Sequence, residues 1–230
     1  MISFNAIWLF SLVGISVIAL ILLVMTMLNS SLRGKDFSLL NNFPFEFLKI
    51  NSGIAYTYKI LMFILTGLAF SPLFVITPLI AEFGDLGFLS ILITCVFGLT
   101  AIANCLLFFF DARFTKSHMV LVTVAMSLTF LSNALATLLS ILVYKTYLDM
   151  SDSHPISLVL AIVSGLIAIG TLALILNPKL NNWAKLKIET SPNGEKIVTR
   201  PKVFILALSE WIIIFLSVIG ELIFLLSLIK

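Results

Sequence analysis

The stretch AIWLFSLVGISVIALILLVMTML occupies residues 6–28 and contains no charged residue. About 20 apolar residues of α-helix, rising 1.5 Å per residue, cross the roughly 30 Å hydrocarbon core of a bilayer. The stretch exceeds the apolar region of a secretory signal peptide, and no basic residue precedes it. We therefore expect a retained membrane-spanning helix here.

Five further stretches have a similar length and apolar character. They cover about residues 56–80, 87–110, 119–144, 156–176 and 203–229. Pro72 and Pro78 predict a kink or a break in the outer half of the first of these five. The sequence thus predicts an all-α, six-helix membrane bundle that forms one integral membrane domain over residues 1–230.

The composition agrees with this fold class. Hydrophobic residues make up 60% of the 230 residues and charged residues 11%, and the mean hydropathy is +1.17. Soluble domains are roughly 45–50% apolar and about 25% charged, which excludes an ordinary soluble enzyme. The net charge of +3 gives no indication of nucleic-acid binding, and two cysteines are too few for a disulfide scaffold.

The basic residues indicate the orientation of the bundle. Twelve of the 14 Lys and Arg residues fall in or beside three alternate connections: Arg33, Lys35, Lys49, Lys59, Arg113, Lys116, Lys179, Lys185, Lys187, Lys196, Arg200 and Lys202. Only Lys145 and Lys230 fall on the other side. By the positive-inside rule the basic connections are cytoplasmic, which places both termini outside the cell membrane.

The two long basic connections differ in character. Residues 29–53 interleave aromatic and basic side chains, which favours a segment lying in the headgroup region against anionic lipid; the alternative is a loop packed under the bundle. Residues 185–190 and 195–200 alternate in polarity around Asn193-Gly194, which predicts a short β-hairpin.

Four polar residues inside the predicted spans form a candidate ion site. They are Glu210 and Glu221 in the last span, Asn104 in the third and Asn133 in the fourth. The two acids are 11 residues apart, so they share one helix face at a separation of roughly 16 Å. One interpretation makes them stations on a proton or cation path; the other assigns them to interhelical hydrogen bonds that fix packing.

A second candidate is an interfacial polar cluster at the start of the fourth span, formed by Asp111, Arg113, Lys116 and His118. No His-rich spacing typical of a metal site occurs, and we expect neither metal nor cofactor. Ser132, Ala136 and Ser140 form a small-residue stripe that predicts close helix packing.

The segment DARFTKSH at residues 111–118, the long first connection and Glu210-Trp211 in the last span together have a familiar order. In plan the chain resembles a prokaryotic six-helix membrane family of unknown function, distantly similar to the DRAM/Sfk membrane proteins. The resemblance implies six helices. Members of that family are pictured with cytoplasmic termini, so this chain departs from them, and no functional residue is carried over.

Three functional classes are open. The first is a non-catalytic bundle that acts in membrane-complex assembly or binds lipid, a membrane-protein partner or a second copy. The second is a small proton- or cation-coupled transporter that uses the acids of the last span. The third is a membrane-embedded enzyme acting on lipids, with His118 and Asp111 as the acid/base pair. We expect the first class.

Overall fold

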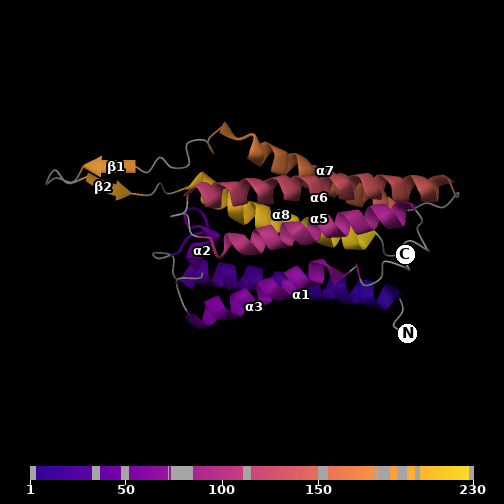
Figure 1. Cartoon of the computed structure of the whole chain (residues 1–230), viewed down its shortest axis with the longest axis horizontal. Helices are drawn as coiled ribbons and strands as arrows, with labels where there is room; N and C mark the ends of the chain where they lie inside the picture. Colours follow the sequence, from indigo (N-terminus) through magenta and orange to yellow (C-terminus); the bar gives the residue numbers. More distant parts are fainter. Residues whose placement is uncertain are drawn as a thin grey trace.

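The computed structural model of this protein (Figure 1) describes residues 4–32, 37–47, 52–71, 73, 85–110, 115–149, 155–178, 180, 187–190, 196–199 and 203–227. Over these residues the chain forms six long helices, one short helix and two strands. In chain order these are α1 (Phe4–Leu32), α2 (Pro44–Phe47), α3 (Ser52–Ala69), α5 (Asp85–Leu107), α6 (Thr115–Asp149), α7 (Pro155–Ile175), β1 (Lys187–Thr190), β2 (Lys196–Thr199) and α8 (Ile205–Ser227).

Five of the described helices are long and apolar enough to cross a membrane. These segments are Leu9–Leu28, Leu86–Leu107, Lys116–Thr146, Ile156–Ile175 and Ile205–Ser227. They overlap five of the six predicted spans, so the prediction of a largely helical integral membrane protein is confirmed at that level.

The predicted span at 56–80 corresponds in part to α3. The apolar part of α3 is Gly53–Ala69, which is shorter than the other five segments. The helix ends three residues before Pro72, where the proline ring and missing N–H group disfavour a continuing helix. Residues 74–84 lie outside the described part of the chain.

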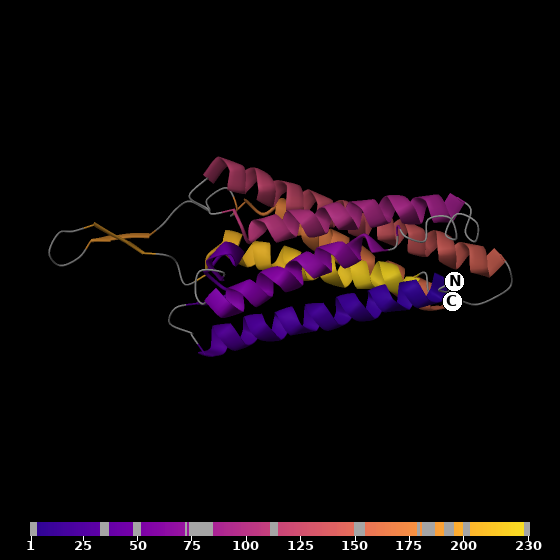
Figure 2. The ribbon, with the colours of Figure 1, turned by 60° about the horizontal axis from the view of Figure 1, so that its bottom comes forward.

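The long helices lie side by side and alternate in direction (Figures 1 and 2). The N-terminal end of α1 and the C-terminal end of α8 lie at one end of the bundle. Helix α2, the two strands and the N-terminal ends of α3, α6 and α8 lie at the other. All three connections that carry the basic residues therefore begin and end at this second end, which we call the basic end.

Helix α8 occupies the centre of the bundle. It contacts α1, α2, α5, α6 and α7, and 61% of its apolar segment is buried, compared with 22% for α1. Helix α1 leaves large apolar side chains such as Phe10, Val13 and Val17 exposed. A helix with such exposed side chains is stable only against lipid or another apolar surface.

The described part of the first long connection packs into the bundle. Phe37, Phe43, Phe45 and Phe47 are each at most 5% exposed, so the predicted headgroup location is wrong for these rings and the alternative of a packed loop holds. Their edges pack against one another and against Trp211 of α8, where burial removes more apolar surface from water than a headgroup location would.

Hydrogen bonds fix this loop to α8. The Trp211 indole Nε1–H donates to the carbonyl oxygen of Asn42 at 2.9 Å, and the Phe204 N–H donates to the carbonyl oxygen of Leu40 at 2.7 Å. The Glu46 carboxylate accepts from the Phe43 N–H at 3.0 Å, which caps the short helix that begins at Pro44.

The strands β1 and β2 pair antiparallel in the segment where a hairpin was predicted. Lys187 lies opposite Thr199, and Thr190 lies opposite Lys196. The pair extends beyond the basic end of the bundle (Figure 2). The predicted Asn193-Gly194 turn lies outside the described residues.

Candidate functional site

A buried ion pair joins α6 to α8 near the basic end. The His118 Nε2 atom lies 2.8 Å from Glu210 Oε1, and both side chains are 0% exposed. The other ring nitrogen, Nδ1, lies 3.1 Å from the carbonyl oxygen of Phe110. A carbonyl oxygen only accepts, so Nδ1 carries a proton and donates it there.

This geometry fixes the charge of the pair. With Nδ1 protonated, two protonation states are consistent with the hydrogen bond to Glu210. In one, a neutral His118 accepts the bond at Nε2 from a protonated Glu210. In the other, a cationic His118 donates it to the Glu210 carboxylate. The pair is neutral overall in both cases. Burial of a neutral pair avoids the large free energy that an isolated charge costs in a low-dielectric interior.

Aromatic rings enclose the pair. Phe43 and Phe45 present their rings edge-on to the imidazole, with centroids 5.5 and 5.9 Å away, and Phe43 also packs on Phe204. The second carboxylate oxygen of Glu210 has no hydrogen-bond partner in the described part of the chain. The enclosure excludes the solvent that would otherwise screen the pair.

The structure differs from the predicted interfacial cluster in the position of His118. Its side chain is buried and both of its ring nitrogens are engaged, whereas Lys116 is exposed and Asp111 and Arg113 lie outside the described residues. A buried imidazole with both nitrogens bonded does not reach a substrate at the membrane surface. Since Asp111, the other member of the predicted acid/base pair, lies outside the described residues, the enzyme alternative stays a prediction.

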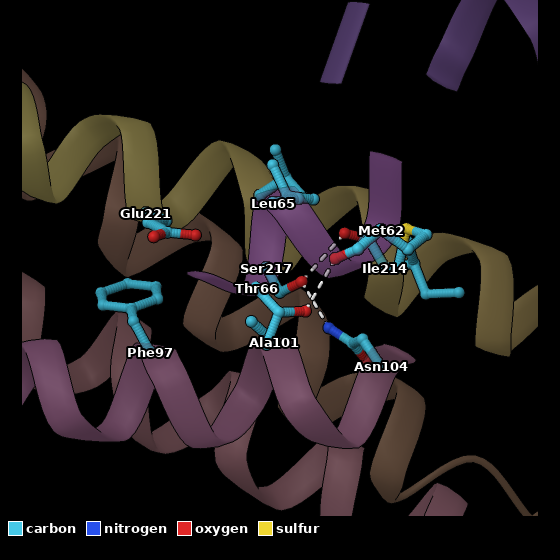
Figure 3. Close-up of a pocket in the computed structure, with 10 residues that line it drawn as sticks. Met62, Leu65, Thr66, Phe97, Ala101, Asn104, Ile214, Ser217 and Glu221 are labelled. Carbon is cyan, nitrogen blue, oxygen red and sulfur yellow. Dashed lines mark hydrogen bonds between the residues drawn. The ribbon is translucent and has the colours of Figure 1, made fainter. Parts of the chain in front are cut away.

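A separate polar cavity of about 20 Å³ lies between α3, α5 and α8 (Figure 3). It is lined by Glu221, Asn104, Ser217, Thr66 and six apolar side chains, among them Phe97 and Ala101. Glu221 is 5% and Asn104 3% exposed. A cavity of this size holds about one water-sized particle.

Hydrogen bonds orient the groups that line this cavity. Asn104 Nδ2 donates to Ser217 Oγ at 2.6 Å, and the Ser217 hydroxyl donates to the Ile214 carbonyl at 2.9 Å. Thr66 Oγ1 donates to the Met62 carbonyl at 2.8 Å. Figure 3 shows the two hydroxyls and the amide nitrogen converging, with the Glu221 carboxylate above the Phe97 ring.

The four predicted ion-site residues fall into three settings. Glu221 and Asn104 share the cavity, and Glu210 binds His118. Asn133 donates from Nδ2 to the Thr129 carbonyl at 2.8 Å, and its Oδ1 meets the backbone of α8 at Gly220. The apolar side chains of Ile213 and Ile214 occupy the turn of α8 that follows Glu210, so the face shared by the two acids is not continuously polar.

Sequence reasoning missed Ser217, Thr66 and the pairing of His118 with Glu210. Helical spacing could have identified Ser217, because it lies one turn before Glu221 on the same face. The pairing joins residues 92 positions apart in different helices, and no local pattern indicates it.

A larger apolar cavity of about 260 Å³ lies between α1, α3 and α8. Its lining contains two polar residues, Ser16 and Tyr58, and eleven apolar ones: Ala19, Leu20, Leu22, Leu23, Met62, Leu65, Ile214, Phe215, Val218, Ile219 and Leu222. Leu20 and Ile219 of this lining are exposed, so the cavity opens to the surface of the bundle. Four of these side chains also line the polar cavity: Met62, Leu65, Ile214 and Val218.

The small residues of the stripe on α6, Ser132, Ala136 and Ser140, are fully buried. Beside them, Thr137 contacts α7, where its Oγ1 atom lies 3.0 Å from Ser164 Oγ. Within the described residues no group of three or more His, Cys, Asp or Glu side chains could hold a metal ion.

Comparisons with known proteins found no matching family model, no matching curated protein and no matching solved structure. The resemblance to the DRAM/Sfk-like family therefore stays a prediction.

Proposed function

We propose that this protein is a non-catalytic membrane bundle that binds one acyl chain of a lipid in the cavity between α1, α3 and α8. The observation that carries the proposal is the 260 Å³ apolar volume, lined by eleven apolar and only two polar residues. Within a bilayer, lipid chains are the apolar molecules present at high concentration, so they are the occupants that such a lining selects.

The lining spans the middle of the bilayer and can be reached from the leaflet at the basic end. The lining of α3 begins at Tyr58, six residues or about 9 Å from the basic end of that helix. The lining of α8 ends at Leu222, 17 residues or roughly 26 Å from its basic end. A chain entering from the leaflet at the basic end reaches the cavity from its headgroup side.

The proposed orientation has six spans, with α3 and its continuation to about residue 80 as the second. The basic end faces the cytoplasm at the cell membrane, and both termini lie outside. Twelve of the 14 basic residues support this orientation, because they belong to connections that begin and end at one end of the bundle. The same charge favours an anionic headgroup above the cavity.

A substitution that fills the cavity should reduce the amount of lipid that the purified protein retains. Ala19→Phe adds a ring inside the lining, and Ala173→Phe places the same ring on an exposed position of α7 as a matched control. Native mass spectrometry of protein extracted in mild detergent then measures retained lipid. We expect Ala19→Phe to lower the retained lipid severalfold and Ala173→Phe to leave it unchanged.

Equal retention by both variants and the parent protein would contradict the acyl-chain site. The headgroup is tested by exchange into nanodiscs of phosphatidylglycerol or phosphatidylcholine. Preferential retention of the anionic lipid is expected, and equal retention of the two would contradict that part of the proposal.

A further inference from the structure

We propose that the polar cavity between α3, α5 and α8 binds one dehydrated monovalent cation, of alkali-metal size, between the Glu221 carboxylate and the hydroxyl oxygens of Thr66 and Ser217. This site goes beyond lipid binding: its polar groups do not line the apolar cavity, although the two cavities share four apolar side chains. It also differs from the predicted four-residue site, because Glu210 and Asn133 do not line it.

The lining of the polar cavity is rich in hydrogen-bond acceptors. The hydroxyl protons of Ser217 and Thr66 are donated to backbone carbonyls of their own helices, and Thr66 also contacts the Cys105 thiol. Each hydroxyl oxygen has two lone pairs, so each keeps acceptor capacity. Ser217 uses one lone pair to accept from Asn104, and the Oδ1 atom of Asn104 has no partner in the described part of the chain. The lining residues thus carry more acceptors than donors, which favours a cation.

The buried carboxyl group of Glu221 needs a positive charge beside it when it is ionised. Glu221 is 95% buried, and none of the described residues forms a hydrogen bond or ion pair with its carboxyl group. An isolated carboxylate in a low-dielectric interior is very costly, so a positive charge has to accompany its ionised form. One carboxylate balances one positive charge, whereas a divalent ion would leave a net charge buried.

The size of the cavity and the type of its polar groups both suit a small cation. About 20 Å³ accommodates an ion without its hydration shell, and the oxygen atoms of carboxylate and hydroxyl groups are the ligands that hard cations prefer. Apolar side chains, among them Phe97, Leu65 and Val218, form the rest of the lining, and this volume leaves no space for a hydrated ion.

The test measures thermal unfolding of the purified protein while Na⁺ replaces choline at constant ionic strength. Choline is too large for the cavity and serves as the reference cation. We expect a saturable rise in Tm with Na⁺. Glu221→Gln should abolish the rise, whereas Glu210→Gln, the same change on the same helix, should retain it.

Thr66→Val provides a second variant of nearly unchanged shape, with Thr171→Val on α7 as its control. The Na⁺ midpoint should rise at least tenfold in Thr66→Val and stay unchanged in Thr171→Val. Binding of ²²Na⁺ to the unmodified protein, displaced by unlabelled Na⁺ but not by choline, gives a readout independent of the variants.

Absence of displaceable ²²Na⁺ binding would overturn the proposal. So would an equal Na⁺-dependent rise in the parent protein and in Glu221→Gln. The Ala19→Phe experiment is independent of both outcomes, because that side chain does not line the polar cavity.

Discussion

Substitution of His118 by alanine should strongly destabilise the contact between α6 and α8. The imidazole supplies the 2.8 Å bond to Glu210 and a second bond to the Phe110 carbonyl, and both members of the pair are completely buried. After the substitution, Glu210 would have no hydrogen-bond partner in the described part of the chain, because its second oxygen already lacks one.

The expected loss follows from these contacts. Breaking a buried pair by removing one member costs about 3–5 kcal/mol. Loss of the bond to Phe110 adds about 1 kcal/mol. Since whole domains are stable by only about 5–15 kcal/mol, a loss of about 4–6 kcal/mol would bring the bundle close to unfolding.

Two further variants separate the pair from the packing around it. Glu210→Gln should cost only about 1 kcal/mol, because the amide N–H can donate to Nε2 while Nδ1–H still donates to Phe110. The double variant His118→Leu/Glu210→Met replaces the pair by apolar groups and should be more stable than His118→Ala.

Reversible unfolding in mixed micelles of dodecyl maltoside and dodecyl sulfate, followed by tryptophan fluorescence, measures these free energies. A double-mutant cycle on His118 and Glu210 gives their coupling. A loss below about 1 kcal/mol in His118→Ala, or strictly additive single substitutions, would refute the assignment of a buried hydrogen-bonded pair.

Three other predictions concern packing and topology. Gly220→Ala should destabilise the bundle by about 1–3 kcal/mol in the same unfolding assay, because the added Cβ overlaps Asn133, whereas Gly170→Ala, with open space around it, should be neutral or stabilising. Trp211→Phe should cost about 1–3 kcal/mol because the buried Asn42 carbonyl loses its indole donor, and its Tm should fall accordingly. Tags fused to either terminus should react with impermeant reagents applied to intact cells; protection of either tag would contradict the proposed orientation.

The sequence was sufficient to predict where most of the long helices lie, because a membrane-spanning helix requires only the length and hydropathy of one continuous segment. A run of about 20 apolar residues meets this requirement wherever its side chains point. The predicted spans at 6–28, 156–176 and 203–229 accordingly overlap α1, α7 and α8 closely. Helix α3 is shorter than its predicted span. The mean hydropathy of a long window is hardly changed by one proline, whereas Pro72 lacks the N–H group that a continuing helix needs.

The aromatic connection shows what composition leaves undecided. Rings interleaved with basic residues favoured a headgroup segment, but a packed loop also buries their apolar surface. The packing depends on Trp211, which lies six residues after the start of α8 and donates its indole N–H to the Asn42 carbonyl, 169 positions away in the sequence. Only the arrangement of helices brings such groups together.

Helical periodicity correctly placed both acids on the buried face of α8 but gave no information about their surroundings. Glu210 meets a histidine from α6 and shares the neutralising proton with it. Glu221 lies about 16 Å further along α8. Its carboxylate lies above the ring of Phe97 and shares a cavity with two hydroxyls whose protons are donated to backbone carbonyls (Figure 3).

That difference separates a packing role from a binding role. Every buried acid in a bilayer requires a positive partner or a bound proton, and Glu210 obtains one from its own chain. No basic side chain lines the cavity around Glu221, so its counter-charge has to be supplied from solution, either as a proton on the carboxyl group or as a bound cation. Because acceptor oxygens of Ser217 and Thr66 lie beside room for one small particle, a bound cation would neutralise Glu221 and use these oxygens as ligands at the same time.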